Sequence, residues 1–574
     1  MTSSMEANDS ASHLALQKKY VNRPFSSFLP FGCLFGTLMK KNSTVMAPPG
    51  IAALRVFLWT VFRAANFLYL PVFVTRIFHR ATPCPPIEND ILLLTAVELA
   101  EKIRKRELTC EAVVKAYIER VKEVNPIINA VIEDRFHDAL EDAKEVDRFL
   151  SNTLMTTEEI EEKKPLLGIP LTVKGSIEVE GMKNTSGVVS RANVIAKEDA
   201  IIVKSARDAG AIPILTSNIP ELCLNWESTN KLVGTTRNPH NTTRTVGGSS
   251  GGEAGLLATA ASIIGVGSDI AGSLRLPAHF CGVWGHKPTP RVVPFAGHYP
   301  SCKNEDEWRE VFTLGPMARY AKDLKLLLKI IANPEAKETL RLDEPVALED
   351  LRIYYIEDLE SILTNKVSSV CLDALHSVVD HMNKLCHVEC EKAKIPLLKY
   401  APEMASLVLL DIDDVDNLFV GRGDGSYAEL FRYFTFRSKS VFMAIAYGVV
   451  RKLSKYIPNS TVEDCRKKLS EMKAELIKML GDNGVLLIPT FPTEAHPHGD
   501  ILRKVLDSGY CVIFNAFGLP VTNCPVKFSK NKLPVGIQVV SAPHNDRLTL
   551  AVAAEIEKTF GGWKPPQPRE KACY

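Results

Sequence analysis

Residues 246–277 read VGGSSGGEAGLLATAASIIGVGSDIAGSLRLP and form the densest cluster of chemically informative residues in the chain. Two glycine-flanked serines, Ser249 and Ser273, stand toward its two ends, and a largely apolar run separates them. Glycine beside a serine lets backbone amides come close to a reacting oxygen, which an oxyanion hole requires. Because the flanks are apolar and helix-forming, we expect an ordered functional site here and not a flexible Gly-Ser linker.

Upstream, Lys174 ends the apolar run PLTVK (170–174), which is typical of a short buried strand. Desolvation at such a position lowers the pKa of a lysine, and the neutral amine is a usable base. Serine with lysine, without histidine, is a known arrangement for nucleophilic acyl transfer. Lys174, Ser249 and Ser273 are therefore candidates for one catalytic site.

Several other motifs compete with this interpretation. Residues 247–251 match the nucleophile elbow of α/β-hydrolases, although the preceding RTV is a weak strand, and this alternative stays open. Glu253 stands where a phosphate-binding loop needs lysine. Residues 265–270 begin like a dinucleotide fingerprint but lack its third glycine. Residues 411–422 hint at a calcium loop with two ligand positions wrongly filled.

Composition excludes several classes of protein. The 574 residues include 69 basic and 67 acidic ones, so nothing predicts a nucleic-acid partner. A hydrophobic fraction of 46% fits a globular protein with a large core. Thirteen cysteines form no CxxC pair, and Cys386, His387 and Cys390 have no second ligand pair at zinc-finger spacing. We expect ordinary thiols in a reducing compartment and no metal.

Helical patterns dominate two regions of the chain. Thr95 and Glu98 have capping-box spacing before an apolar helical repeat. A second helix is predicted to end before Asn125-Pro126, and a third, charged one to cover about 135–150. Residues 345–480 are again predicted to be mainly helical.

Strand-like runs fill the middle and the end of the chain. They are PLLGIPLTVK (165–174), AIPILTSN (211–218), GVLLIPT (484–490), YCVIFNAFGLPVTNCPV (510–526) and LPVGIQVV (533–540). Strands that alternate with helices indicate an α/β core. The simplest organisation is one domain whose core strands come from both regions.

Near the N-terminus, residues 51–78 are long and apolar enough to span a bilayer, but Arg55 and Arg63 interrupt them. Arg55, Trp59, Arg63 and Asn66 would share one polar stripe of a helix. This pattern favours a helix that lies in the membrane interface, or one that spans it with the stripe shielded. A buried amphipathic helix of a soluble domain is the alternative.

We therefore divide the chain into three parts. Residues 1–45 are a polar N-terminal extension, 46–82 an apolar membrane-anchor helix, and 83–574 the catalytic domain, with a proline-rich joint at 83–88. Met46 is a second candidate for the start of the protein.

The motifs together resemble the amidase-signature family. Residues 247–290 look like its long signature segment, and PLTVK (170–174), TLGPMAR (313–319) and LPVTNCPV (519–526) match its companion motifs in order. Within the family the chain is most similar to type-2 fatty-acid amide hydrolases, for example in ELCLNWES (221–228). The resemblance implies an α/β fold with a large, twisted, mixed β-sheet surrounded by helices.

The resemblance also implies a role for each residue of a Ser-cisSer-Lys triad. Ser273 would be the nucleophile that forms the acyl-enzyme. Ser249, after a cis peptide bond, would relay a proton between Ser273 and Lys174. Lys174 would act as the base. The oxyanion hole would consist of the backbone amides of Ile270, Ala271, Gly272 and Ser273. No metal or organic cofactor is expected.

Other residues of the signature segment receive structural interpretations. Arg275 is expected to hold the loop through a carboxylate such as Asp269, and His279 and His286 are expected to be structural. Ala271 occupies a position that is usually glycine, and a positive φ there would strain the loop. Gly175 follows the lysine where an acidic residue is common.

Two hypotheses of function follow. The first is a membrane-associated amidase that cleaves long-chain fatty-acid amides, with residues 345–480 forming its acyl channel and membrane-facing mouth. Amidases of small soluble amides and glutamine-hydrolysing components of tRNA amidotransferases are rivals within this class. The second hypothesis is a catalytically silent protein that binds lipid amides. Expected partners are a lipid amide and membrane lipid, with a possible homodimer, on a cytoplasm-facing endomembrane.

Overall fold

The computed structural model describes Ile51, Arg55 and residues 80–302, 304–412 and 425–567. The chain divides into two units, Met1–Ala47 and Pro48–Tyr574, and every described residue belongs to the second. The three-part division predicted above therefore has its first part, and nearly all of its second, outside the described residues.

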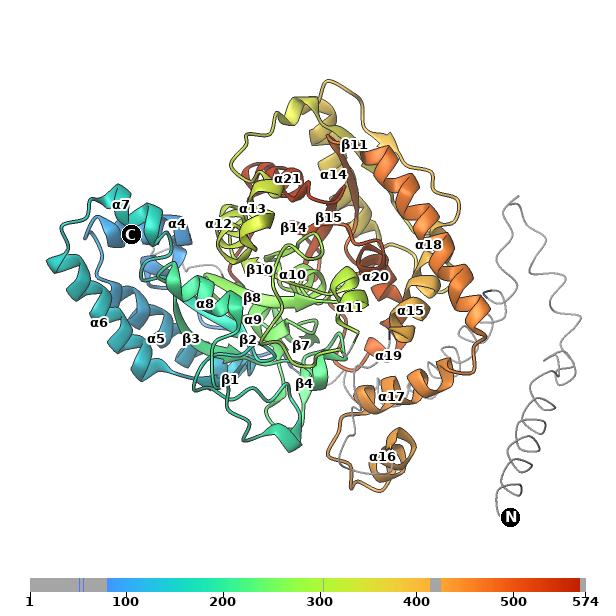
Figure 1. The fold of residues 1–574 in the computed structure, drawn as a ribbon, viewed down its shortest axis with the longest axis horizontal. Coiled ribbons are helices and arrows are strands. Elements are labelled where there is room, and N and C mark those ends of the chain that lie inside the picture. Colours follow the sequence, from blue (N-terminus) through green and yellow to red (C-terminus); the bar gives the residue numbers. More distant parts are fainter. Residues whose placement is uncertain (1–50, 52–54, 56–79, 303, 413–424, 568–574) are drawn as a thin grey trace, which may run out of the picture. The chain divides into compact units, whose positions relative to one another are not determined.

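An 11-stranded mixed sheet runs through the second unit (Figure 1). Its strands, in spatial order, are β1 (Val131–Asp134), β3 (Ile212–Ser217), β2 (Pro170–Lys174), β8 (Ile264–Asp269), β10 (Thr313–Ala318), β9 (Trp284–Lys287), β14 (Val521–Phe528), β15 (Pro534–Ser541), β13 (Gly484–Pro489), β11 (Arg352–Tyr355) and β12 (Glu391–Lys392). The predicted α/β class with one large mixed sheet is confirmed.

Most central strands are buried along their whole length, which explains why they are continuous apolar runs without alternation. β2 pairs in parallel with both β3 and β8. The neighbours β8 and β10 are antiparallel. Two small sheets, β4 (Thr229–Asn230) with β5 (Gly234–Thr235) and β6 (Arg237–Asn238) with β7 (Asn241–Thr245), lie in the segment before the first serine loop.

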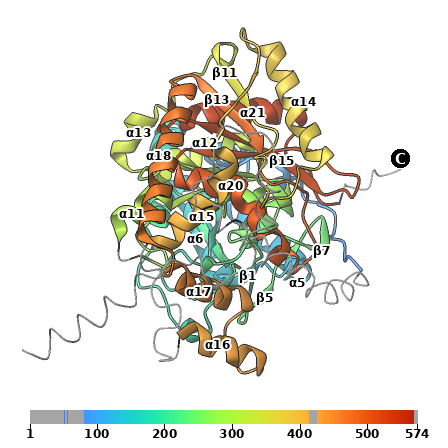
Figure 2. The same cartoon turned by 90° about the vertical axis from the view of Figure 1, so that its right-hand side faces the viewer.

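Helices surround the sheet (Figures 1 and 2). They are α4 (Ala96–Arg104), α5 (Cys110–Ile128), α6 (Phe136–Asn152), α7 (Thr157–Lys163), α8 (Ile201–Asp208), α9 (Gly251–Ala258), α10 (Arg275–Cys281), α11 (Glu305–Val311), α12 (Ala321–Ile331), α13 (Pro334–Leu340), α14 (Ser369–Leu385), α15 (Ala401–Asp411), α16 (Gly425–Phe434), α17 (Phe442–Ser454), α18 (Asn459–Leu480), α19 (Ile501–Lys504), α20 (Gly509–Ala516) and α21 (Asp546–Phe560). The predicted capping box is present at α4, where Thr95 and Glu98 satisfy each other's backbone amides.

Two predicted elements are wrong. Helix α5 continues through Pro126 to Ile128, and the next residue, Asn129, has a left-handed backbone. The Asn125 side chain accepts hydrogen bonds from the amides of Ala130 and Val131, which satisfies the backbone just past the helix end. Residues 510–516, predicted as the start of a strand-like run, belong to α20 (Gly509–Ala516). The prediction is wrong because an apolar run that is buried on every side has no periodicity that separates helix from strand.

Of the predicted membrane-anchor helix at 46–82, the structure describes Ile51, Arg55 and residues 80–82, and residues 80–82 are not helical. The rest of this segment lies outside the described residues. Arg55 is buried, and its guanidinium lies 2.7 Å from the Glu403 carboxylate of α15 and 4.4 Å from the ring centre of Tyr400. Within the described part of the chain, no helix is both long and apolar enough to cross a membrane. One member of the predicted polar stripe is thus shielded by protein.

Candidate active site

Lys174 ends β2 and is completely buried. Its Nζ lies 2.7 Å from Ser249 Oγ, 2.8 Å from Ser268 Oγ and 3.3 Å from the Ser268 carbonyl oxygen. Burial lowers the pKa of Lys174, because the ammonium form loses its hydration. A lysine with three polar partners and a lowered pKa can alternate between ammonium and neutral amine.

The loop that carries Ser249 packs closely against the segment around Asn225. The peptide bond between Gly248 and Ser249 is cis, as the resemblance implied. A Cβ on Gly248 would lie 2.6 Å from the Asn225 carbonyl oxygen, so a glycine is required at this close approach. Helix α9 begins two residues later and continues away from the serine. The strand before the loop, β7, forms a two-stranded sheet with β6 that is separate from the 11-stranded sheet, so the nucleophile-elbow alternative lacks its central-sheet strand.

Ser273 follows β8 in a turn that an ion pair holds. The Asp269 carboxylate accepts hydrogen bonds from the amides of Gly272 (2.7 Å) and Leu274 (3.0 Å). Both Asp269 oxygens also bond to the Arg275 guanidinium at 3.0 Å. Arg275 is fully buried and further bonded to Gln538 and Asn515, which belong to β15 and α20. The predicted role of Arg275 as a clamp on the loop through Asp269 is confirmed.

This clamp bears on the predicted oxyanion donors. The Gly272 amide is already bonded to Asp269, so it is not free in this conformation. Among the described residues, the amides of Ile270, Ala271 and Ser273 have no acceptor. Of the four predicted oxyanion donors, these three amides are therefore the ones available to a substrate oxygen in this conformation.

Backbone geometry removes the concern about Ala271. Its φ is not positive, whereas Gly272 has a φ of +99°. A Cβ on Gly272 would lie 2.6 Å from Cys511 Cβ. Glycine is therefore required at 272 and not at 271. At Gly175, a Cβ would meet Ile132 Cδ1 at 2.3 Å, so the side chain of Ile132 occupies the space an acidic residue would need.

The two serine loops are adjacent, because the Ser250 amide donates to the Ser273 carbonyl oxygen at 3.2 Å. The Trp226 indole donates to the Ala271 carbonyl oxygen at 2.8 Å, which fixes the other side of the turn. Ser249 is 1% exposed and Ser273 is 4% exposed. Within the described part of the chain, the Ser273 hydroxyl makes no hydrogen bond, so it is available to a substrate.

Two residues near Lys174 were not predicted. His298, in the loop after β9, lies 3.2 Å from Ser268 Oγ through its Nε2. Glu253 of α9 is fully buried, accepts from the Thr172 hydroxyl, and has its pKa raised to about 7 by burial. Glu253 is in the quoted motif and could have been suspected, but nothing local in the sequence marks His298.

The two histidines of the signature segment have structural positions. His279 bonds to the Thr493 carbonyl oxygen and to the Gly536 amide, and His286 lies between Thr522 and Asp546. Burial lowers the pKa of His279 to about 4.

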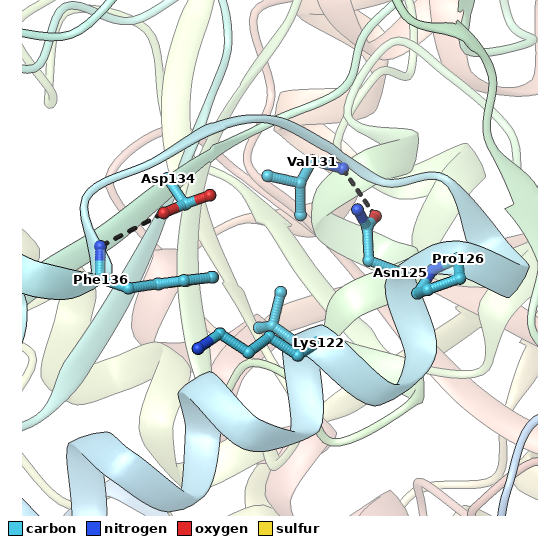
Figure 3. Close-up of a pocket in the computed structure, with 7 residues that line it drawn as sticks. Lys122, Asn125, Pro126, Val131, Asp134 and Phe136 are labelled. Carbon is cyan, nitrogen blue, oxygen red and sulfur yellow. Dashed lines mark hydrogen bonds between the residues drawn. The ribbon is translucent and has the colours of Figure 1, made fainter.

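A hollow of about 490 Å³ lies apart from this cluster. It is lined by residues of α5, β1 and the start of α6, among them Lys122, Asp134 and Phe136 (Figure 3). Asp134 accepts from the Phe136 amide, and Lys122 lies 5.6 Å from the Phe136 ring centre. None of its lining residues belongs to the predicted site.

Comparison with known proteins identifies the family. A family model described as "Amidase" matches residues 112–550. The chain is 39% identical to "Fatty-acid amide hydrolase 2" of Homo sapiens over 91% of this chain and 99% of that protein. It belongs to the amidase-signature family. As a member it is a hydrolase of amide bonds, and the predicted family membership is confirmed.

Other relatives of this amidase differ in the activity their names state. The chain is 29% identical to a glutamyl-tRNA(Gln) amidotransferase subunit of Caldanaerobacter subterraneus subsp. tengcongensis, over 83% of this chain and 99% of that one. A solved structure called "Fatty acid amide hydrolase" matches with a TM-score of 0.66 and 22% identity, over 91% of this chain and 92% of that one. At that identity the structural match demonstrates the shared fold.

Proposed function

We propose that this amidase cleaves its substrate through Ser273, Ser249 and Lys174 with an acyl-enzyme intermediate. The observation that carries the proposal is the 2.7 Å contact between Lys174 Nζ and Ser249 Oγ, at a lysine whose pKa burial lowers. A base must lie within hydrogen-bond distance of the proton it removes, and a neutral amine satisfies this condition here.

The reaction proceeds in two stages. Ser273 Oγ attacks the amide carbonyl carbon while its proton passes to Ser249 Oγ and the Ser249 proton passes to Lys174 Nζ. The carbonyl oxygen becomes an oxyanion that the amides of Ile270, Ala271 and Ser273 stabilise. The proton returns through Ser249 to the amine nitrogen, the carbon–nitrogen bond breaks, and the acyl group remains as an ester on Ser273. Water then attacks this ester while its proton passes through Ser249 to Lys174, and the proton returns through Ser249 to Ser273 Oγ as the free acid is released.

Fatty-acid amides are the proposed substrate class. The support is the printed name of the human relative at 39% identity, a level well above the 29% of the bacterial amidotransferase component. The alternative of a silent lipid-amide binder had Ala271 as its only support, and the φ of Ala271 removes that reason. Hydrolysis of small soluble amides, including glutamine, remains the rival within the enzyme class.

The test uses membrane fractions that contain wild type, Ser273→Ala or Lys174→Ala. We expect a serine-directed fluorophosphonate to label wild type and not Ser273→Ala. Oleamide and an N-acylethanolamine should be hydrolysed by wild type, and about 10²–10⁴-fold more slowly by Lys174→Ala. Labelling with turnover of glutamine but of neither lipid would keep the triad and overturn the substrate class. A folded protein without labelling would overturn the triad.

We further propose that the enzyme associates with membrane lipid through α16, α17 and the segment 46–82. In both views α16 lies at the outer edge of the unit, beyond α17 (Figures 1 and 2). Large apolar side chains are exposed on these helices and at their ends: Tyr427, Phe431, Phe434, Phe436, Val450, Leu453 and Tyr456. Phe436 is 99% exposed. Exposed apolar groups that gather on one element mark a contact surface for protein or lipid.

Vesicle binding tests the lipid contact. We expect the triple change of Phe431, Phe434 and Phe436 to serine to weaken binding to phosphatidylcholine vesicles at least tenfold, since each buried phenylalanine contributes about 1.5–3 kcal/mol. Hydrolysis of a short soluble amide should be unchanged. Leu154→Ser is the matched control, because Leu154 is fully exposed but lies before α7. Equal binding by the triple variant and wild type would contradict the proposed contact.

A further inference from the structure

His298 is buried in the loop that follows β9. Its ring lies 4.8 Å, between centres, from the Phe312 ring. Nδ1 lies 3.1 Å from the Pro300 carbonyl oxygen, and Nε2 lies 3.2 Å from Ser268 Oγ. His298 therefore contacts the Lys174 environment through one hydroxyl, that of Ser268.

These contacts fix where the protons lie. A carbonyl oxygen only accepts, so Nδ1 of His298 carries a hydrogen and donates it to Pro300. Burial lowers the pKa of His298 to about 3, so the ring is neutral near pH 7. A neutral imidazole protonated on Nδ1 has a bare Nε2, which accepts. The Ser268 hydroxyl hydrogen therefore points at His298 and away from Lys174.

The consequence falls on the lysine. Neutral Lys174 has two hydrogens and one lone pair for its three polar contacts. The Ser268 carbonyl oxygen cannot donate, and the Ser268 hydroxyl has already donated to His298. Lys174 therefore donates its two hydrogens to the hydroxyl and carbonyl oxygens of Ser268. Its lone pair is left to accept the hydrogen of the third partner, the Ser249 hydroxyl.

We propose that His298 is a positioning residue that, through Ser268, directs the Lys174 lone pair to the Ser249 proton. The proposal rests on the triad proposed above and adds the group that sets its proton direction. Without the His298 acceptor, the Ser268 hydroxyl can rotate and donate to Lys174, where it competes with Ser249. That competing bond stabilises the neutral amine, so it lowers the lysine pKa and weakens the base.

The pH profile of kcat tests this arrangement, because its acidic limb reports deprotonation of Lys174. We expect His298→Phe to lower kcat about tenfold, to leave KM within about twofold, and to move the acidic limb down by about half a pH unit or more. Phenylalanine keeps the ring contact with Phe312. His298→Gln, which restores an acceptor, should recover most of kcat and the limb. His298→Leu replaces the phenylalanine variant if that variant does not fold.

Coupling to Ser268 separates positioning from general loop support. In a Ser268→Ala background, His298→Phe should cause no further shift of the limb, because no hydroxyl remains to orient. His240→Phe is the matched control: His240 is partly buried, with its pKa lowered to about 4 by desolvation, and it bonds to the Cys281 carbonyl oxygen and not to the lysine cluster. It should keep the wild-type limb.

The possible failures are distinguishable. Absence of fluorophosphonate labelling in folded wild-type protein would overturn the triad itself. Intact labelling with an unmoved limb in His298→Phe, or an equal limb shift with and without Ser268, would overturn the role of His298 alone. A change confined to thermal stability would likewise assign His298 to packing and contradict the proposal.

Discussion

At the scale of single residues, the loop before Ser273 makes opposite demands on two neighbours. Gly272 has a φ of +99° and faces Cys511, whereas Ala271 has ordinary backbone geometry. The family resemblance raised the question of a positive φ at Ala271, but the positive φ occurs one residue later, at Gly272. Only the backbone of the folded loop shows which of the two positions needs glycine.

This difference gives the first prediction. Gly272→Ala should cost about 1–3 kcal/mol of stability, from the left-handed backbone and the contact with Cys511, and should lower kcat by displacing the Ser273 turn. Ala271→Gly is the matched control and should stay within about 1 kcal/mol of wild type. Chemical denaturation and amide hydrolysis measure the two effects. If Ala271→Gly were the more destabilising of the two variants, the assignment of the left-handed position to Gly272 would be wrong.

At the scale of elements, α15 holds the buried end of an ion pair. Arg55 lies 2.7 Å from Glu403, and its guanidinium also donates to the Lys399 carbonyl oxygen. Burial raises the pKa of Glu403 to about 7, more than Arg55 lowers it, so the carboxylate form predominates only above that pH. The ion pair is therefore best tested at a pH where both groups are ionised.

The second prediction concerns this pair at pH 8. Glu403→Leu should destabilise the protein by about 3–5 kcal/mol, because it leaves the Arg55 guanidinium buried without a carboxylate. The double change Arg55→Met with Glu403→Leu should recover most of that loss, since two apolar groups can replace a buried pair. Denaturation of the three proteins measures the difference. A double variant no more stable than Glu403→Leu would show that the pair does not act as a unit.

At the scale of the whole molecule, the sheet joins distant parts of the chain. β9, from the middle of the sequence, pairs with β14, near its end, with His286 opposite Thr522. β14 and β15 then lie between β9 and β13, in the interior of the strand order. Arg275 crosses the same junction, because its partner Gln538 lies on β15. The loop that holds Ser273 is therefore supported by the last strands of the chain.

The third prediction follows from that order. A chain ended after Gly518 loses β14, β15 and α21 and leaves β9 and β13 with unpaired edges. We expect it to be insoluble and to lose fluorophosphonate labelling. The milder change Gln538→Ala keeps both strands but removes one Arg275 partner, and it should keep the fold while labelling is slowed. A soluble, labelled truncation would contradict the dependence of the site on these strands.

The sequence by itself determined the family, the α/β class, the buried strand that ends at Lys174, and the capped start of α4. These features depend on residues close together in the chain, where periodicity, capping and motif spacing are strong. Even at this scale the predictions at Pro126 and at residues 510–516 are wrong, because side-chain hydrogen bonds and complete burial outweighed local preference. The tertiary structure decided what lies around Lys174. His298 comes to Ser268 from 30 positions away, and its role depends on hydrogen-bond geometry, which only the packed fold creates.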